Sequence, residues 1–190
     1  MSKYSFLLLL ILLSSSLFSQ DKEFSSGLIM DDGDYEMQPR EARFPGSKYN
    51  NLPLKVDLKQ YCPEVGHQGG IESCVGWSVG YGALTIERAI QNGWTDKSKI
   101  TENANSALFI YNQVKEDQNC GSGSKISAAV QLIIKEGDCL SHSFDGDANN
   151  CEKQPDNTRR TEANNYIVSD YLTLFSPADE PALKLSLIHI

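Results

Sequence analysis

Residues 68–77 decide the fold; they read Gln-Gly-Gly-Ile-Glu-Ser-Cys-Val-Gly-Trp. Cys74 stands where an amphipathic helical pattern begins, six residues after Gln68. A thiol at a helix N-terminus lies beside unpaired backbone N–H groups and the positive end of the helix dipole, which favour the thiolate. The amide side chain of Gln68 is of a kind that donates to a developing oxyanion. The stretch therefore predicts a cysteine nucleophile with an oxyanion donor just upstream.

The residues that follow Cys74 predict a helix that runs to about Ile90. Apolar side chains recur every three or four residues, which is the period of a helix with one buried face. Glycines in the same span lower its helix propensity, so we expect a neighbouring element packed closely against them. Asn92-Gly93 is a typical helix end. The apolar positions are Val75, Val79, Ala83, Ile86 and Ile90, and the glycines are Gly76, Gly80 and Gly82.

Two more helices are expected further along the chain. Residues 105–114 form the shorter one, and Ser124 is the expected N-cap of the other, which Gly137 ends. Beyond Cys139 the chain turns polar, and two short runs at residues 166–168 and 171–172 indicate the first strands of a β-rich part. The inward-facing residues expected in the third helix are Ile126, Ala129, Val130, Ile133 and Ile134.

The first 51 residues divide into a leader and a tail. Residues 1–19 contain Lys3, an apolar run from Phe6 to Leu13 and a serine-rich end, which is the pattern of a secretory signal peptide. A membrane span needs about 20 apolar residues, so we expect no stable membrane anchor. Residues 20–51 are acidic, lack a period, and are interpreted as a tail or a short pro-segment. The sequence thus predicts an exported protein with one domain over residues 52–190.

The charge balance excludes one class of partner. The chain has 25 acidic and 17 basic residues, which give a formal net charge of −8. Nucleic-acid binding needs clustered Lys and Arg, and the one basic pair is Arg159-Arg160. We therefore expect no nucleic-acid partner.

Five cysteines in an exported chain favour disulfides, and the odd number leaves at least one unpaired. Four cysteines allow three pairings that a sequence cannot separate. We prefer Cys62 with Cys120 and Cys139 with Cys151, which leaves Cys74 free.

Four sequence features, taken together, resemble the papain-like cysteine proteases. Leu-Pro-x-x-x-Asp at residues 52–57 matches the start of the mature domain, and Gln68-Gly69 precedes the Ser73-Cys74 pair at the family's spacing. Residues 120–123, Cys-Gly-Ser-Gly, echo the family's Cys-x-Gly-Gly turn. The resemblance covers about residues 52–177.

The resemblance implies a fold and an activity. The fold would be α+β and papain-like, with a helical N-terminal half and the beginning of a β-rich half. The function would be that of a secreted endopeptidase that hydrolyses peptide or protein substrates. In it Cys74 attacks the carbonyl carbon, Gln68 and the Cys74 N–H hold the oxyanion, and Ser122 and Gly123 offer backbone to an extended peptide. No cofactor is implied beyond a reducing environment for Cys74.

The chain also departs from the family pattern. Ile71 stands where the family has a disulfide cysteine, and Val75 replaces an aromatic residue. The family's His and Asn lie roughly 130 to 150 residues beyond the cysteine, which is past Ile190. His67, His142 and His189 do not have the family's context, and the final Leu-Ser-Leu-Ile-His-Ile looks like a non-native scar. We therefore expect a truncated domain that lacks part of its active site.

Alternative functions stay open on sequence grounds. The departures also fit a non-catalytic papain-like binding or surface protein, and a third option is another thiol acyltransferase or amidase. No metal is predicted, because Cys62, His67, Cys74 and Cys120 match no closed zinc pattern. Asp145, Asp147 and Asn149 alternate like the start of a calcium loop, but the glycine and the bidentate glutamate of that loop are replaced.

Overall fold

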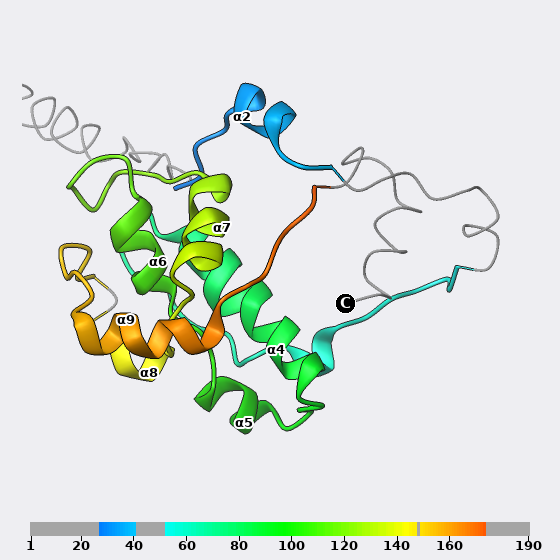
Figure 1. Cartoon of the computed structure of the whole chain (residues 1–190). Coiled ribbons are helices and arrows are strands. Elements are labelled where there is room, and N and C mark those ends of the chain that lie inside the picture. Colours follow the sequence, from blue (N-terminus) through cyan, green and yellow to red (C-terminus); the bar gives the residue numbers. More distant parts are fainter. Residues whose placement is uncertain (1–26, 41–51, 148, 174–190) are drawn as a thin grey trace, which may run out of the picture.

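A single helical rod that begins at Cys74 runs through the molecule. The structure is a computed structural model that describes residues 27–40, 52–147 and 149–173, and α6 (Ala107–Val114) and α7 (Ile126–Lys135) lie beside this rod (Figure 1). The rod consists of α3 (Cys74–Gly76), the π-helical stretch η3 (Trp77–Leu84) and α4 (Thr85–Gln91), and the backbone stays right-handed helical across both junctions. Gly93, at φ +62°, follows its last residues, which confirms the expected helix end.

Two of the rod's glycines, Gly76 and Gly80, lie where α6 (Ala107–Val114) crosses it. A Cβ on Gly76 would sit 2.1 Å from the carbonyl oxygen of Ala107, and one on Gly80 would sit 2.8 Å from that of Ser106. No side chain larger than hydrogen fits between two backbones at that distance. The expectation of a closely packed neighbour is confirmed for Gly76 and Gly80, whereas a Cβ on Gly82 would meet only the Trp77 carbonyl oxygen of the rod itself, at 3.3 Å.

The N-terminus of α6 is satisfied by side chains from two parts of the chain. Ser106 Oγ accepts from the Phe109 N–H at 2.8 Å, and the carboxylate of Asp145 accepts from the N–H groups of Ala107 and Leu108 at 3.1 Å each. These are donors that a helix leaves unpaired within itself. Asp145 also accepts from the hydroxyl groups of Ser106 and Ser141. The residue that suggested a calcium loop therefore caps a helix.

The third expected helix is α7 (Ile126–Lys135). Its N-cap is Lys125 and not Ser124, whose hydroxyl is buried without a partner in the described part of the chain. Ala129 and Ile133 are buried as expected, but Ile126 is 49% exposed, so its inward placement was wrong. The helix starts one residue later than predicted because the backbone of Ser124 is engaged by residues 27–29.

Several short helices escape the sequence prediction. Three of them have an aspartate N-cap whose side chain accepts a backbone N–H: Asp31, Asp96 and Asp156. These helices span two turns or less, too short for a hydrophobic period to identify them. The short helices are α2 (Asp32–Met37), η2 (Lys59–Tyr61), α5 (Lys97–Glu102), α8 (Ser141–Phe144), α9 (Asn157–Ala163) and η4 (Asn164–Tyr166).

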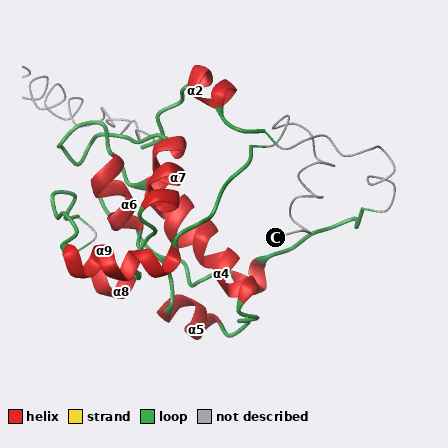
Figure 2. Cartoon of the chain, in the orientation of Figure 1, coloured by secondary structure: helices red, strands yellow, loops and turns green. Residues whose placement is uncertain are grey.

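The expected start of a β-rich half is wrong. Figure 2 shows helices and loops and no strand in the described part of the chain, so the structure there is helical and not α+β. Tyr166 ends η4, and residues 167–172 form no regular secondary structure. Ile167 and Leu172 are 47% and 57% exposed, whereas Val168 packs against α7 and donates its N–H to the Ile133 carbonyl at 3.3 Å. The segment is thus anchored to a helix and not paired with a strand. The described residues form only isolated bridges: Leu28–Ser124, Arg40–Thr173 and Asn105–Leu140.

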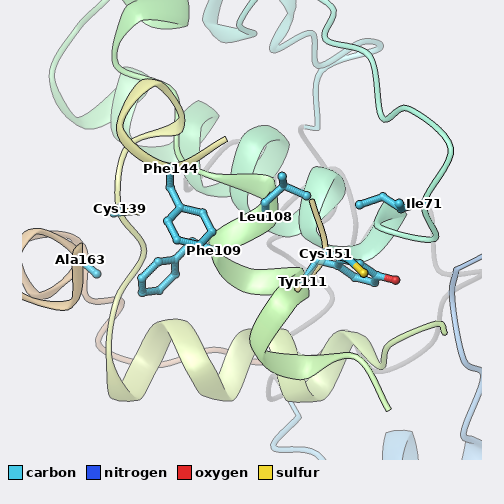
Figure 3. Close-up of a cluster of buried hydrophobic side chains, with 8 residues drawn as sticks. All are labelled: Ile71, Leu108, Phe109, Tyr111, Cys139, Phe144, Cys151 and Ala163. Carbon is cyan, nitrogen blue, oxygen red and sulfur yellow. The ribbon is translucent and has the colours of Figure 1, made fainter. Parts of the chain in front are cut away.

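The core lies on both faces of α6. One cluster contains the Phe109 and Phe144 rings, whose centroids are 5.8 Å apart in an edge-on contact, together with the buried Tyr111 (Figure 3). A second cluster joins α6 to the rod and α7 through Val75, Val79, Ile110, Ala129 and Ile133. Within the described ranges, no helix is long and apolar enough to cross a membrane.

Candidate functional site

Cys74 is the first residue of the central rod. Its thiol is partly exposed and forms no disulfide, and its side chain packs against the Val75 cluster. The preceding Ser73 is fully buried at the N-cap position, and Trp77 donates its N–H to the Ser73 carbonyl at 3.1 Å. The N–H of a first helical residue has no intrahelical acceptor, so the Cys74 N–H is available to an oxyanion.

Gln68 lies in the loop that leads to this helix. Its Nε2 donates to the carbonyl oxygen of Ile71 at 2.6 Å, and Gly69 turns the chain at φ +80°. A glutamine amide has two N–H groups, and the Ile71 carbonyl takes one of them. The second remains a donor, and the side chain is fixed to the loop just ahead of Ser73-Cys74.

Ser122 and Gly123 belong to a turn with its own internal partners. Ser122 Oγ accepts from the Asp117 N–H at 2.9 Å, and the Ser122 carbonyl accepts from the Tyr111 hydroxyl at 2.8 Å. The carbonyl of Gly123 accepts from the Glu116 N–H at 3.1 Å. Because Ser122 is buried, its side chain points away from any peptide that would approach the turn.

The backbone edge beside this turn is occupied by the chain itself. Ser124 donates its N–H to the Gly27 carbonyl at 2.8 Å, and its own carbonyl accepts from the Ile29 N–H at 3.0 Å. These two bonds form a parallel bridge between Leu28 and Ser124. Residues 27–29 therefore pair at the position next to Gly123, where the sequence predicted substrate backbone.

The same segment is held at both ends. Gly27 is buried so closely that a Cβ on it would sit 2.1 Å from the Glu72 carbonyl oxygen, and Leu28 packs against the cluster that Cys74 also contacts. At the other end Lys125 forms an ion pair with Asp31 at 2.6 Å. Residues 27–31 thus run from the Cys74 loop to the start of α7.

Trp77 fills the space beside the loop over residues 63–70. A Cβ on Gly66 would lie 2.3 Å from the Trp77 ring, and the centroids of the Trp77 and Tyr81 rings are 4.7 Å apart. Tyr81 donates its hydroxyl to the Glu64 carbonyl at 2.8 Å. Trp77 and Tyr81 thus hold this loop against the rod, one and two turns after Cys74.

The disulfide joins Cys120 to Cys151, with 5.4 Å between their Cα atoms. The preferred pairs, Cys62 with Cys120 and Cys139 with Cys151, are therefore both wrong, and Cys62, Cys74 and Cys139 are free. The pairing follows from α6, because Tyr111 holds the segment of Cys120 and Asn112 holds the segment before Cys151. Burial raises the pKa of the Cys139 thiol, which leaves it unreactive.

The histidines do not complete the site. His67 is exposed and accepts from the Gly69 N–H at 3.0 Å, and His142 lies in α8 with Nδ1 3.2 Å from the Glu102 carbonyl. Neither is hydrogen-bonded to Cys74, and His189 lies outside the described residues. Across the ranges described, no cluster of three or more Cys, His, Asp or Glu side chains is arranged to hold a metal ion.

Sequence analysis missed a buried carboxyl, Asp138. It is fully buried, and neither of its carboxyl oxygens has a hydrogen-bond partner among the described residues. Burial, reinforced by Asp145, raises its pKa well above the usual range, and the attraction of Arg88 opposes that shift only in part. Asp138 touches the rod at Gly80, 2.9 Å from the position of a Cβ there. An aspartate after a helix-ending glycine looks like a surface turn, so no local signal could have identified it.

The comparisons with known proteins show a fold and do not show a family. No protein-family profile and no curated protein matches the chain. Among solved structures, the chain is similar to xylellain, a cysteine protease from Xylella fastidiosa, with a TM-score of 0.62 and 23% identity. The match covers 84% of this chain, which spans 61% of the xylellain chain. The chain thus shares, over that length, the fold of a cysteine protease.

Proposed function

We propose that this chain belongs to a secreted papain-like cysteine endopeptidase in which Cys74 is the nucleophile. The observation that carries the proposal is the free, partly exposed Cys74 at the first residue of the central helix, in a fold similar to that of a cysteine protease. At this position the sulfur lies beside backbone N–H groups that the helix leaves unpaired. Gln68, fixed six residues ahead, adds a side-chain donor.

The proposed reaction has two stages. The Cys74 sulfur attacks the scissile carbonyl carbon, and the oxyanion is held by the Cys74 N–H and the free Gln68 N–H. The thiol proton passes to an imidazole, which gives it to the leaving amine as the C–N bond breaks. Water then hydrolyses the thioester, which releases a carboxylic acid and restores the thiol. Neither His67 nor His142 is hydrogen-bonded to Cys74, so neither is assigned as this imidazole.

The substrate is an extended peptide that pairs with the backbone near Gly123. Support comes from residues 27–29, which already pair with Ser124 in an extended conformation. We assign residues 20–51 as a pro-segment, because their described part occupies this edge and reaches Glu72. Peptide binding then requires that residues 27–29 leave the edge.

Export is the proposed location. The signal-like sequence of residues 1–19 supports it, and so does the Cys120–Cys151 disulfide, since such bonds persist mainly in oxidising compartments.

Active-site labelling tests the proposal. We expect Cys74 in the full-length protein to react with a thiol-directed epoxide far faster than free cysteine at pH 6, and Cys74→Ala to abolish both labelling and turnover of a peptide library. A matched Cys62→Ala variant controls for the other partly exposed thiol. Labelling of Cys74 no faster than free cysteine would support a non-catalytic binding protein instead. Fast labelling without peptide turnover would favour another thiol amidase or acyltransferase.

A further inference from the structure

The loop over residues 68–72, which we call the oxyanion loop, is held by two hydrogen bonds that its backbone N–H groups donate to other segments. The Gly70 N–H donates to Asn149 Oδ1 at 3.0 Å, and the Glu72 N–H donates to the Cys120 carbonyl at 3.0 Å. Gln68 is tied within the same loop to the Ile71 carbonyl, which lies between those two contacts. The position of the loop therefore sets the position of the Gln68 amide.

The two acceptors belong to segments that are covalently joined. Cys120 forms the disulfide with Cys151, which lies two residues after Asn149. The Cys151 N–H also donates to the Asn149 carbonyl at 3.1 Å. The two segments that accept from Gly70 and Glu72 are thus parts of one unit, which the disulfide cross-links.

Neighbouring residues of α6 anchor that unit to the core. The Tyr111 hydroxyl lies 3.0 Å from the Cys120 carbonyl oxygen and shares its one proton between this oxygen and that of Ser122, and Asn112 Nδ2 donates to the carbonyls of Asn150 and Lys153 at 3.0 and 2.8 Å. Burial raises the pKa of Tyr111 to about 12, so its hydroxyl stays protonated and continues to donate at neutral pH. The rigid helix that crosses the rod below Cys74 therefore also carries the supports of the oxyanion loop.

We propose that Asn149, supported by the Cys120–Cys151 disulfide, is a positioning residue that keeps the oxyanion loop, and with it the Gln68 amide, in the place that catalysis at Cys74 needs. The inference rests on the proposed function for its catalytic consequence. Asn149 is exposed, and its side chain reaches the loop from 79 positions away in the sequence, so its removal affects the loop and not the core. Misplacement of a catalytic donor by a fraction of an ångström reduces rate more than substrate affinity.

The test compares Asn149→Ala with Asn149→Asp in the full-length protein. An aspartate at this position keeps an oxygen acceptor for the Gly70 N–H, whereas alanine does not. For Asn149→Ala we expect kcat on a fluorogenic peptide substrate to fall about 5- to 10-fold with KM little changed, and exchange of the Gly70 amide hydrogen to rise about 10-fold, as for the loss of one hydrogen bond. Asn149→Asp is expected to restore both quantities.

Asn150→Ala is the matched control, because the Asn150 side chain accepts from the Lys153 N–H and does not touch the oxyanion loop. An unchanged kcat in Asn149→Ala, or a loss that Asn149→Asp does not rescue, would overturn the proposal. Absence of turnover and of epoxide labelling in the unsubstituted protein would refute the proposed function.

Hydrogen exchange tests the positioning role of Asn149 separately. If the Gly70 amide exchanges equally fast in Asn149→Ala and in the unsubstituted protein, Asn149 does not hold the loop. Slower exchange in the unsubstituted protein supports that role.

Discussion

The Ser124 N–H donates to the Gly27 carbonyl oxygen across 2.8 Å, so a segment from the start of the chain lies on the edge beside the Cys120–Gly123 turn. The pairing is parallel and continues into the Ile29 N–H bond to the Ser124 carbonyl. A peptide that uses this edge has to compete with an intramolecular partner, which is present at a high effective concentration.

Replacement of Ile29 by proline tests that competition. Proline removes the N–H that bonds Ser124, so we expect residues 27–29 to leave the edge more often and epoxide labelling of Cys74 to become faster. The measurement is the second-order labelling rate at pH 6. Met30→Ala, at a neighbouring position that is 77% exposed, is the control. Equal rates in Ile29→Pro and the unsubstituted protein would show that the segment does not limit access to the thiol.

Gly76→Ala probes the crossing of the rod and α6. Alanine favours a helix over glycine by about 1 kcal/mol, but its Cβ would lie 2.1 Å from the Ala107 carbonyl oxygen. Overpacking of this kind costs about 1 to 3 kcal/mol or more, so the clash outweighs the propensity and we expect net destabilisation. Urea unfolding measures it through the midpoint. Gly146→Ala, with open space around the added Cβ, is expected to change stability little; similar midpoints for the two variants would contradict the crossing.

The buried carboxyl of Asp138 is expected to make the free energy of unfolding depend on pH. Its pKa is raised in the folded protein by burial first and by Asp145 next, so the native state holds a proton that the unfolded chain releases. The resulting stabilisation is complete below the unfolded pKa of about 3.9 and is lost as the pH rises through the folded value. Asp138→Asn cannot titrate, and we expect its stability to fall less than that of the unsubstituted protein between pH 4 and pH 8 (about the range from the unfolded aspartate pKa upwards).

The measurement is the free energy of unfolding in urea at several pH values. Glu152→Gln, at an exposed position, controls for the loss of one carboxylate. Parallel pH profiles for Asp138→Asn and the unsubstituted protein would show that the buried carboxyl is not protonated in the folded state. Arg88 and Glu162 also act on this carboxyl, so their variants are not suitable controls.

Cysteine mapping tests the disulfide and the free thiols together. In the native protein we expect alkylation at Cys62 and Cys74, because both thiols are partly exposed, and none at Cys139, which is fully buried. Cys139 becomes reactive only in denaturant, and Cys120 and Cys151 only after reduction. Peptide mass mapping after each step gives the order. A Cys62–Cys120 peptide would refute the pairing found in the structure.

Helix positions could be predicted because their signals are local. The rod from Cys74, α6 and α7 follow from apolar residues three or four apart, and the glycines Gly76 and Gly80 correctly indicated a close neighbour. The predicted strands near Tyr166 failed because a strand needs a partner along its length, and no described segment forms a bridge with residues 166–172, where Val168 packs on a helix instead. The N-cap of α7 failed for a related reason, since Ser124 pairs with a segment almost a hundred positions away.

The sequence alone determined where the central helix begins and that a cysteine stands at its first residue, because periodicity and helix ends depend on neighbours along the chain. Only the tertiary structure decided which cysteines pair, that residues 27–29 occupy the edge at Ser124, and that Asn149 reaches Gly70. These contacts join residues far apart in sequence, so no pattern of neighbouring residues encodes their geometry.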